Sequence, residues 1–291
     1  MSNQKKIILC PNAERDIGFE MSWKVGEMLK KHGLPTAFCP VFDDFSTARI
    51  PTPGYEPTCL EDEISTAEMI IAIGGDGTIL RAARAAAEHG VPILGINLGG
   101  KGFLAELEAD DIGMIDSAVL GGYRLENRMM LDVEVLRDGE TACLDFALND
   151  VVIKGNNKVI DLNLYGDEQL ISHFSGDGVV IATPTGSTAY SMAAGGPIVE
   201  EAAHNIIVTP ICAHVLEAKS FVLVSDRRVS VELGHKKRNP AYMSVDGGEH
   251  IDIRNGDLIK VFKSGRSTSL IRLSKKSFYK KVSDKLGERT L

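Results

Sequence analysis

The chain has 291 residues, enough for one large domain or two of ordinary size. Hydrophobic residues make up 44% and charged residues 25% of it, a composition typical of a soluble globular protein with a sizeable core. A formal net charge of −8 argues against nucleic-acid and membrane-surface binding, because both need a basic face. We interpret the basic run at 235–238 as a solvated loop between strands.

The cysteines and histidines indicate neither disulfides nor a zinc site. The five cysteines are odd in number and form no CxxC pair, and the seven histidines show no HxxxH or HExxH spacing. Reduced thiols fit a cytoplasmic protein best. The apolar run near the N-terminus is too short for a signal peptide or a membrane span, so we expect it to form a first buried strand.

Strand and helix signals alternate in the first part of the chain. Apolar runs predict buried strands, and apolar residues at helical spacing predict helices. The predicted strands are 6–10, 69–73 and 91–96, and the predicted helices are 17–32, 78–90 and 108–120. Residues 40–60 are rich in Pro, Asp and Thr and are predicted to be loop. This order implies an α/β domain over 1–123 with a parallel sheet.

The alternation of predicted strands and helices ends near Tyr123. From 124 to 273, runs of alternating polarity are separated by turn signals such as Asp138-Gly139 and Asn255-Gly256. This is typical of an antiparallel, all-β domain, which we expect to be a sandwich. The tail over 274–291 returns to helical spacing, and we expect it to pack on the first domain.

A glycine-rich turn follows the second predicted strand. The stretch IIAIGGDGTILRAARAAAEHG places Gly74, Gly75 and Gly77 between a buried strand and a helix. Glycines let the backbone turn sharply and expose its N–H groups, and the helix presents its positive end, so the turn can hold a phosphate. The turn is neither a Walker A sequence nor a dinucleotide GxGxxG fingerprint. A tight turn without a ligand explains it equally well.

Asp76 stands inside this turn. As an N-cap it would contribute about 1 kcal/mol. Beside a bound phosphate, its carboxylate could instead accept a proton from an attacking hydroxyl or help to hold Mg²⁺.

Two basic residues are candidates for phosphate contacts. Arg81 could reach a phosphate, although a solvated helix arginine is the simpler interpretation, and Lys158 is a weaker candidate of the same kind.

Four further segments complete a pattern in chain order. They are GINLGGKGFLAEL at 95–107, ND at 149–150, GDG at 176–178 and TPTGSTAYSMAAGGP at 183–197. Together with the glycine turn, this set resembles the bacterial NAD kinase family over about residues 70 to 290. The GGDG turn alone is also similar to phosphofructokinases and to diacylglycerol and sphingosine kinases, whereas TPTGSTAYS is far more specific.

The resemblance implies a fold and an activity. It implies an α/β N-terminal domain with a phosphofructokinase-like nucleotide fold, an all-β C-terminal domain that binds substrate, and an active site between them. The implied activity is ATP-dependent phosphorylation of the adenosine ribose 2′-hydroxyl of NAD to give NADP. Mg²⁺, or another divalent cation, would enter with ATP and be held mainly by phosphates. Homodimers or homotetramers would be expected.

The resemblance also assigns roles to single residues. Asp76 matches the family's catalytic acid and Gly77 the neighbouring glycine that contacts nucleotide. Asn149 and Asp150 match an Asn-Glu pair that contacts substrate. Asp177 matches the acid of an acid-glycine pair, and the substrate-binding segment corresponds to Thr188, Ala189, Tyr190 and Ser191.

The chain departs from the family pattern at three places. Asp150 is one methylene shorter than the family's Glu, Gly248 stands where many relatives have Gln, and the residues around His214 differ. Two other functions stay open at this point. One is a lipid or sugar kinase that shares the GGDG turn, and the other is a non-catalytic NAD-binding sensor.

Overall fold

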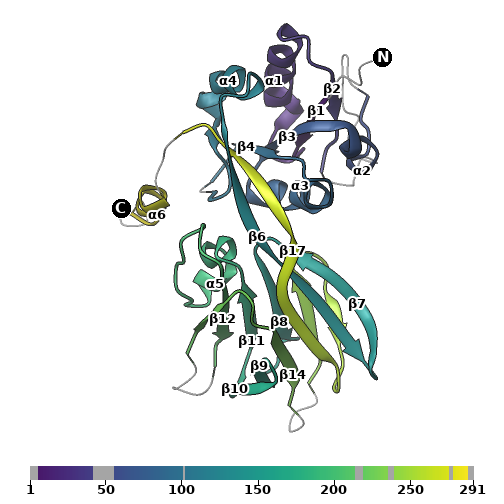
Figure 1. The fold of residues 1–291 in the computed structure, drawn as a ribbon, viewed down its shortest axis with the longest axis vertical. Helices are drawn as coiled ribbons and strands as arrows, with labels where there is room; N and C mark the ends of the chain where they lie inside the picture. Colours follow the sequence, from purple (N-terminus) through teal and green to yellow (C-terminus); the bar gives the residue numbers. More distant parts are fainter. Residues whose placement is uncertain are drawn as a thin grey trace. The chain divides into compact units, whose positions relative to one another are not determined.

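The fold is described from a computed structural model. It describes residues 6–41, 56–100, 102–213, 219–234, 239–274 and 278–287. His214, the basic run at 235–238 and most of the predicted loop at 40–60 lie outside these ranges. The chain divides into two compact units (Figure 1). Unit one comprises the described residues up to Asn127 and those from Thr268 onward, and unit two comprises those from Arg128 to Ser267.

Unit one is built on a parallel sheet. Its strands are β1 (Lys6–Pro11), β2 (Thr36–Phe38), β3 (Ala67–Gly74), β4 (Ile93–Asn97) and β5 (Leu107–Glu108). The order is β4-β3-β1-β2, β5 also pairs with β4, and Leu270 of β17 (Leu258–Arg272) pairs with Ile93. The three predicted strands are therefore confirmed. Strand β2 was not predicted, because it has only three residues and therefore carries little alternation of polar and apolar side chains.

Helices cover both faces of this sheet. They are η1 (Ile17–Phe19), α1 (Glu20–Lys31), α2 (Leu60–Glu63), η2 (Ile64–Thr66), α3 (Asp76–His89), η3 (Ala109–Met114), α4 (Ile115–Val119) and α6 (Phe278–Gly287). Val25 of α1 and Ile115 of α4 join one core with Ile71 of β3. On the other face, Gly95 of β4 lets α3 approach, because an added Cβ would lie 2.5 Å from Ile79 Cδ1.

Two predicted helices differ in detail. The helix predicted at 17–32 begins later, because Gly18 and Phe19 have positive φ angles of 65° and 56°. Asp16 then accepts the N–H groups of Met21 and Ser22 in the first turn of α1. The helix predicted at 108–120 is a 3-10 turn followed by the short α4. The predicted end of α3 is confirmed, since Gly90 adopts the left-handed conformation of a C-cap, with φ 67°.

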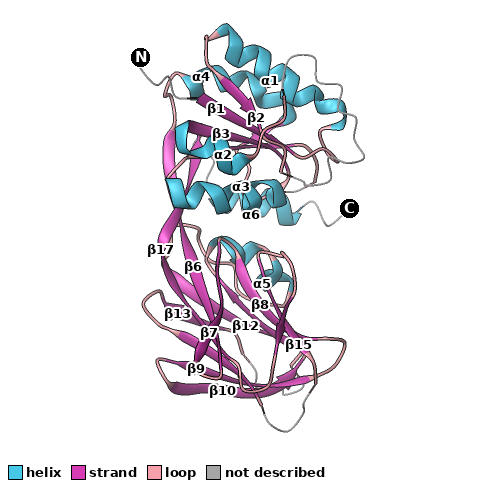
Figure 2. Cartoon of the chain, turned by 90° about the vertical axis from the view of Figure 1, so that its right-hand side faces the viewer, coloured by secondary structure: helices cyan, strands magenta, loops and turns pink. Residues whose placement is uncertain are grey.

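Unit two consists almost entirely of antiparallel strands (Figure 2). They are β6 (Arg124–Arg137), which begins in unit one, β7 (Glu140–Ala147), β8 (Asp150–Gly155), β9 (Ile160–Gly166), β10 (Gln169–Gly176), β11 (Gly178–Ala182), β12 (Asn205–Ile211), β13 (Phe221–Val224), β14 (Val229–Leu233), β15 (Ala241–Val245), β16 (Ile251–Ile253) and the first part of β17. One layer runs β13-β12-β11-β8-β15-β16. The other runs β10-β9-β14-β17, continuing through β6 to β7. Their inner faces share one core, to which Val231 and Val179 belong. The predicted all-β sandwich is confirmed.

The segment TPTGSTAYSMAAGGP interrupts the strands of unit two. It contains η4 (Thr185–Thr188) and α5 (Tyr190–Ala193). Ala194 and Val199 pack against Val180 and Ile207, on the sheet face opposite the main core. The segment is therefore fixed to a rigid layer. Within the described residues, no helix is both long and apolar enough to cross a membrane.

Candidate active site

The glycine-rich turn joins β3 to α3. Gly74 must be glycine, because a Cβ there would lie 2.3 Å from Thr78 Oγ1 and 2.9 Å from Asn12 Cβ. Gly75 is the N-cap of α3, and its N–H donates to Thr78 Oγ1 at 3.3 Å. Gly77 is exposed, and nothing lies within 4 Å of a Cβ added there. The backbone is thus open to a ligand at Gly77.

The Asp76 carboxylate is held by a neighbouring loop. Its Oδ2 accepts the N–H of Phe103 at 2.7 Å, and its Oδ1 accepts the N–H of Leu104 at 3.0 Å. Asp76 is the first residue of α3 and not its N-cap, so the interpretation as a simple helix cap is wrong. A half-buried carboxylate with both oxygens fixed by backbone amides has a defined direction, as a catalytic group needs.

Two arginines lie near this turn. Arg81, one turn into α3, is exposed and donates from Nη1 to the Val41 carbonyl at 3.0 Å. Arg15 was missed by the sequence analysis. Its Cζ lies 3.5 Å from a Cβ added at Gly75, and its Nη1 lies 2.1 Å from one added at Gly99. The guanidinium of Arg15 therefore lies directly beside the glycine turn.

Asn97 ends β4 next to Asp76. Its Nδ2 donates to the Gly100 carbonyl at 3.0 Å and to Glu108 Oε2 at 2.7 Å. Its Oδ1 is buried, and no described residue donates to it. A Cβ on Gly102 would lie 2.6 Å from Asp76 Oδ1 and 3.7 Å from Asn97 Oδ1, so both acceptors flank this glycine.

In unit two, Asn149 directly precedes β8, Asp150 is the first residue of β8, and Asp246 holds the backbone of both. The Asp246 carboxylate accepts the N–H groups of Leu148, Asn149 and Asp150 at 2.8, 2.7 and 3.0 Å. Asp246, which has a φ of 50° in the turn after β15, was not among the predicted site residues. Asn149 Oδ1 is buried and receives no hydrogen bond from a described residue. Its hydrogen-bonding capacity is therefore unmet within the described residues.

The segment around η4 packs against Asn149. A Cβ on Gly186 would lie 2.1 Å from the Asn149 carbonyl oxygen, so the two backbones touch. Thr188 Oγ1 donates to the Thr185 carbonyl at 3.2 Å, and the Ser191 hydroxyl bonds Thr209 Oγ1 at 3.0 Å. Both hydroxyls have partners inside the protein. They stabilise the segment, and any contact they make with substrate remains a prediction.

Tyr190 interacts electrostatically with Lys154. It is 37% exposed, and it is the main cause of a raised pKa at Lys154, with smaller contributions from Tyr242 and Asp177. Lys154, on β8, was not predicted, whereas the predicted Lys158 is exposed in the turn between β8 and β9. Ala189 is half-buried beside Tyr190. Gly248 offers only its backbone, with its N–H bonded to the Val245 carbonyl at 2.8 Å.

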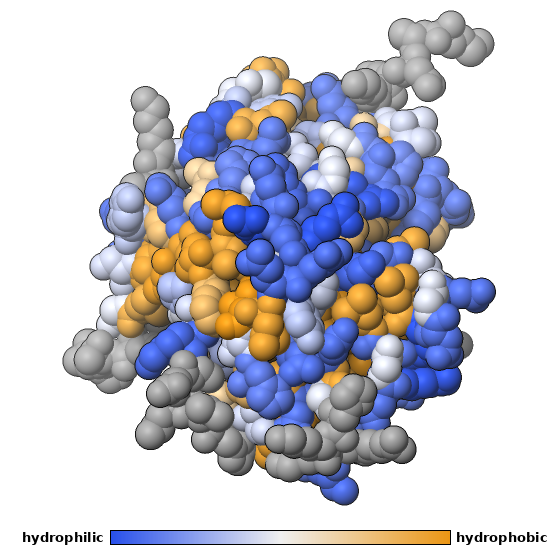
Figure 3. Space-filling model, turned by 60° about the horizontal axis from the view of Figure 1, so that its bottom comes forward, coloured by the Kyte–Doolittle hydropathy of each residue, from blue (hydrophilic) through white to orange (hydrophobic). Residues whose placement is uncertain are grey.

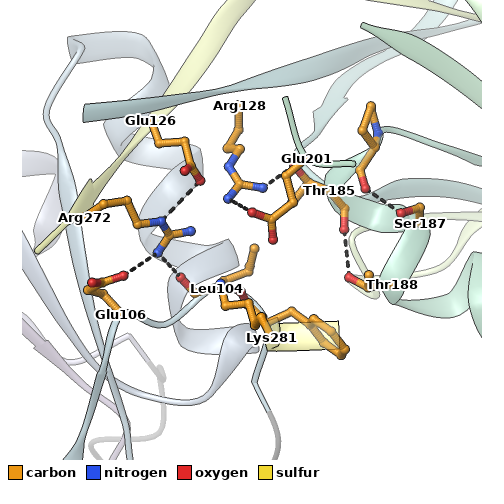
Figure 4. A network of polar contacts seen from close by, with 12 residues as sticks. Leu104, Glu106, Glu126, Arg128, Thr185, Ser187, Thr188, Glu201, Arg272 and Lys281 are labelled. Atoms are coloured by element: carbon orange, nitrogen blue, oxygen red, sulfur yellow. Dashed lines mark hydrogen bonds and ion pairs between the residues drawn. The ribbon is translucent and has the colours of Figure 1, made fainter. Parts of the chain in front are cut away.

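Arg128 holds the segment that contains η4 through Glu201 and Thr185 (Figure 4). It is fully buried, forms an ion pair with Glu201 and donates from Nη1 to Thr185 Oγ1 at 3.4 Å. A buried guanidinium with a carboxylate partner fixes the position of η4.

Asp150 is the most strongly perturbed acid of unit two. Burial raises its pKa to about 7; the nearby Asp246 carboxylate adds to the shift, and a hydrogen bond from the Tyr190 backbone opposes it. Because the pKa is higher in the folded than in the unfolded chain, stability is lost as pH rises from the unfolded value of 3.8 and the loss is complete above about 7.

Replacing Asp150 with Asn is therefore expected to stabilise the protein at high pH. The neutral amide avoids the cost of burying a charge, so the gain in Tm should be about 5 °C larger at pH 8 than at pH 5. Thermal unfolding at both pH values measures it. Asp226→Asn, at an exposed acid of the same unit, is the control and should shift Tm equally at both. A pH-independent effect of Asp150→Asn would contradict the burial argument.

Two family models match most of the chain. The family model described as ATP-NAD kinase N-terminal domain matches residues 30–122, and the one described as ATP-NAD kinase C-terminal domain matches 148–273. The chain belongs to the NAD kinase family. It is an ATP-dependent kinase, and the resemblance and the enzyme class predicted from the sequence are confirmed.

Relatives within the NAD kinase family cover nearly the full length. The NAD kinase of Ruminiclostridium cellulolyticum is 35% identical over 98% of this chain and 99% of its own, and that of Natranaerobius thermophilus is 37% identical over 97% and 98%. The chain is also similar to yeast NADH kinase complexed with NADH, with TM-score 0.84, 22% identity and coverage of 99% and 89%. It resembles an Archaeoglobus fulgidus NAD kinase in complex with ATP, with TM-score 0.72, 23% identity and coverage of 98% and 99%. These two likenesses confirm the fold class.

Proposed function

We propose that this chain transfers the γ-phosphoryl group of ATP to the 2′-hydroxyl of the adenosine ribose of NAD, giving NADP and ADP. Membership of the NAD kinase family supports both substrates. The observation that carries the proposal is the Asp76 carboxylate, fixed by two backbone amides beside the exposed Gly77 at the start of α3.

Asp76 acts as the general base in this reaction. Each of its oxygens accepts one N–H and keeps a lone pair for the ribose hydroxyl. As the bond from the hydroxyl oxygen to the γ-phosphorus forms, the bond to the bridging oxygen of ADP breaks and the proton passes to Asp76. The loose transition state depends mainly on position and charge, so Arg15, Gly75, Gly77 and the N-terminus of α3 hold the phosphates, and the buried Gly74 allows the turn to form.

Unit two supplies groups that recognise the nucleotide. Asn149 binds the adenine amine or a ribose hydroxyl, for which its buried Oδ1 has to become accessible; the cost of leaving that oxygen without a donor favours the contact. The exposed ring of Tyr190 can stack on a base. Asp150 and Asp177 bind sugar or base donors, and Thr188, Ala189 and Ser191 shape the segment that carries Tyr190. Arg81 and Lys158 remain candidates for outer phosphate contacts.

Mg²⁺ enters as part of the substrate Mg-ATP. Within the described residues, no group of three or more His, Cys, Asp or Glu side chains could hold a metal ion. The cation is held mainly by phosphate oxygens, whose charge it neutralises.

The domain roles, location and assembly are part of the proposal. Residues 1–123 with the tail 274–291 bind nucleotide, and residues 124–273 bind substrate. The protein is cytoplasmic, as its free thiols favour. It forms a homodimer or homotetramer, and exposed apolar residues on unit two support this: Leu144, Leu170, Val222 and Val224. The face in Figure 3 likewise shows apolar patches separated by polar side chains.

A coupled assay for NADP formation from NAD and Mg-ATP tests the function. NADP and ADP are expected in equal amounts. If diacylglycerol or sphingosine were phosphorylated and NAD were not, the lipid-kinase alternative would hold. If calorimetry showed NAD binding without any ADP release, the chain would be a sensor.

A further inference from the structure

Two consecutive peptide groups connect Asp76 to the C-terminal helix. In the first, the Phe103 N–H donates to Asp76 Oδ2 at 2.7 Å while the Gly102 carbonyl accepts from Lys285 Nζ. In the second, the Leu104 N–H donates to Asp76 Oδ1 at 3.0 Å while the Phe103 carbonyl accepts from Lys281 Nζ. Each carboxylate oxygen is thus linked through one peptide group to one ammonium group.

Arg272 anchors the end of the same loop. Its Nη1 donates to the Leu104 carbonyl at 2.9 Å, and its Nε donates to Glu126 Oε1 at 3.2 Å (Figure 4). It is 4% exposed and also lies 3.6 Å from Glu106 Oε2. Glu106 in turn accepts the backbone N–H groups of Leu273 and Ser274 at 3.0 and 2.8 Å. The loop and the chain that leaves β17 are therefore held together.

We propose that Lys281 and Lys285 are positioning residues for catalysis, acting on Asp76 through the two peptide groups of the 102–104 loop. This inference rests on the proposed role of Asp76 as general base. A cation on a carbonyl oxygen polarises the peptide group and makes its N–H a stronger donor. The two lysines are four residues apart, so they lie on the same side of α6 and can serve adjacent peptide groups.

The contacts of the two ammonium groups point toward the loop. Both ammonium groups donate to carbonyl oxygens of the loop, and Lys285 also lies 5.8 Å from the centre of the Phe103 ring. Both lysines are half-buried. Each ammonium group has three N–H donors, so the effect of its loss on KM for ATP is what separates the two roles. The tail of the chain therefore completes the catalytic centre of unit one.

The test uses Lys281→Met, Lys285→Met and the double variant in the full chain, with Lys→Arg at each position as rescue. We expect kcat to fall about tenfold for each lysine removed, which corresponds to about 1.4 kcal/mol of activation free energy. KM for NAD and for ATP should be unchanged, and the Lys→Arg variants should keep most of the wild-type rate. Lys24→Met, at an exposed lysine of α1, is the charge-matched control. A rise in KM for ATP with kcat unchanged would show phosphate binding and overturn the proposal, as would wild-type rates in the double variant.

Two further measurements separate positioning from general stabilisation. In the Asp76→Asn background, the double lysine change should lower kcat less than twofold, because the carboxylate that the lysines position is no longer present. An equal loss in both backgrounds would overturn the proposal. Hydrogen exchange of the Phe103 and Leu104 amides should become about tenfold faster in the double variant, even if the wild-type chain formed no NADP. Unchanged exchange would show that the two lysines do not act on the Phe103 and Leu104 peptide groups, and would overturn the proposal. Faster exchange together with no NADP formation would refute only the proposed function.

Discussion

Replacing Asp76 with Asn is expected to lower kcat by about 10²–10⁴-fold while KM for NAD and ATP changes little. The amide has nearly the same shape as the carboxylate, so substrates still bind. It cannot take a proton from the ribose hydroxyl, and its NH₂ group cannot accept the Phe103 N–H that Asp76 Oδ2 accepts. Steady-state kinetics with NAD and ATP varied separately measure both parameters.

Two controls make the result specific. Asp62→Asn changes an exposed acid in the first turn of α2 and should leave kcat unchanged. Thermal unfolding of Asp76→Asn should show a loss of about 1 kcal/mol or less, the value of one altered hydrogen bond. A variant with wild-type turnover would exclude Asp76 as the base, and a variant that unfolds at the assay temperature would indicate a structural role instead.

The fold followed from the sequence where its signals are local. The buried strand run at 69–73 and the left-handed Gly90 are readable within a few residues, as is the turn at Asp138 and Gly139, where both residues have positive φ. The start of α1 was mispredicted because helical spacing continues through Gly18, whose backbone breaks the helix. Spacing describes which side chains face the core and does not specify φ angles.

The site was predictable only in part, because the residues that hold its functional groups in place are distant from them in the sequence. The glycine turn identified Asp76, yet nothing near Asp76 in the sequence points to the Phe103 and Leu104 amides or to Lys281. Asp246 is likewise remote from the Asn149 backbone that it holds. These contacts depend on tertiary packing, which no short motif encodes.

Arg15 is the exception among the missed residues. It follows β1, which pairs in parallel with β3, and the register places Pro11 opposite Ile73, just before the glycine turn. The carboxyl ends of adjacent parallel strands share one edge, so loops that follow β1 and β3 must be neighbours. A cation in the first loop could have been assigned to the site on this argument alone.

Arg128→Met is expected to cost about 3–5 kcal/mol of unfolding free energy. Arg128 is fully buried, and its partner Glu201 has a side chain that is only 14% exposed. Removing the guanidinium leaves the largely buried Glu201 carboxylate without the positive charge of Arg128. It also removes the hydrogen bond that Arg128 donates to Thr185 Oγ1. Because η4 begins at Thr185, the segment that carries Tyr190 should loosen, and KM for NAD should rise. Urea unfolding and initial rates measure the two effects.

A double-mutant cycle decides whether the buried charge is the cause. Replacing both partners, as Arg128→Met with Glu201→Met, removes the uncompensated carboxylate and should recover most of the lost stability. The control is Arg227→Met, which breaks an ion pair with Asp167 whose side chains are 56% and 40% exposed. That change should cost about 1 kcal/mol or less, because solvent screens exposed pairs. If Arg128→Met cost no more than Arg227→Met, the buried ion pair would not support η4, and the position of Tyr190 would depend on the Thr188 and Ser191 hydroxyl bonds instead.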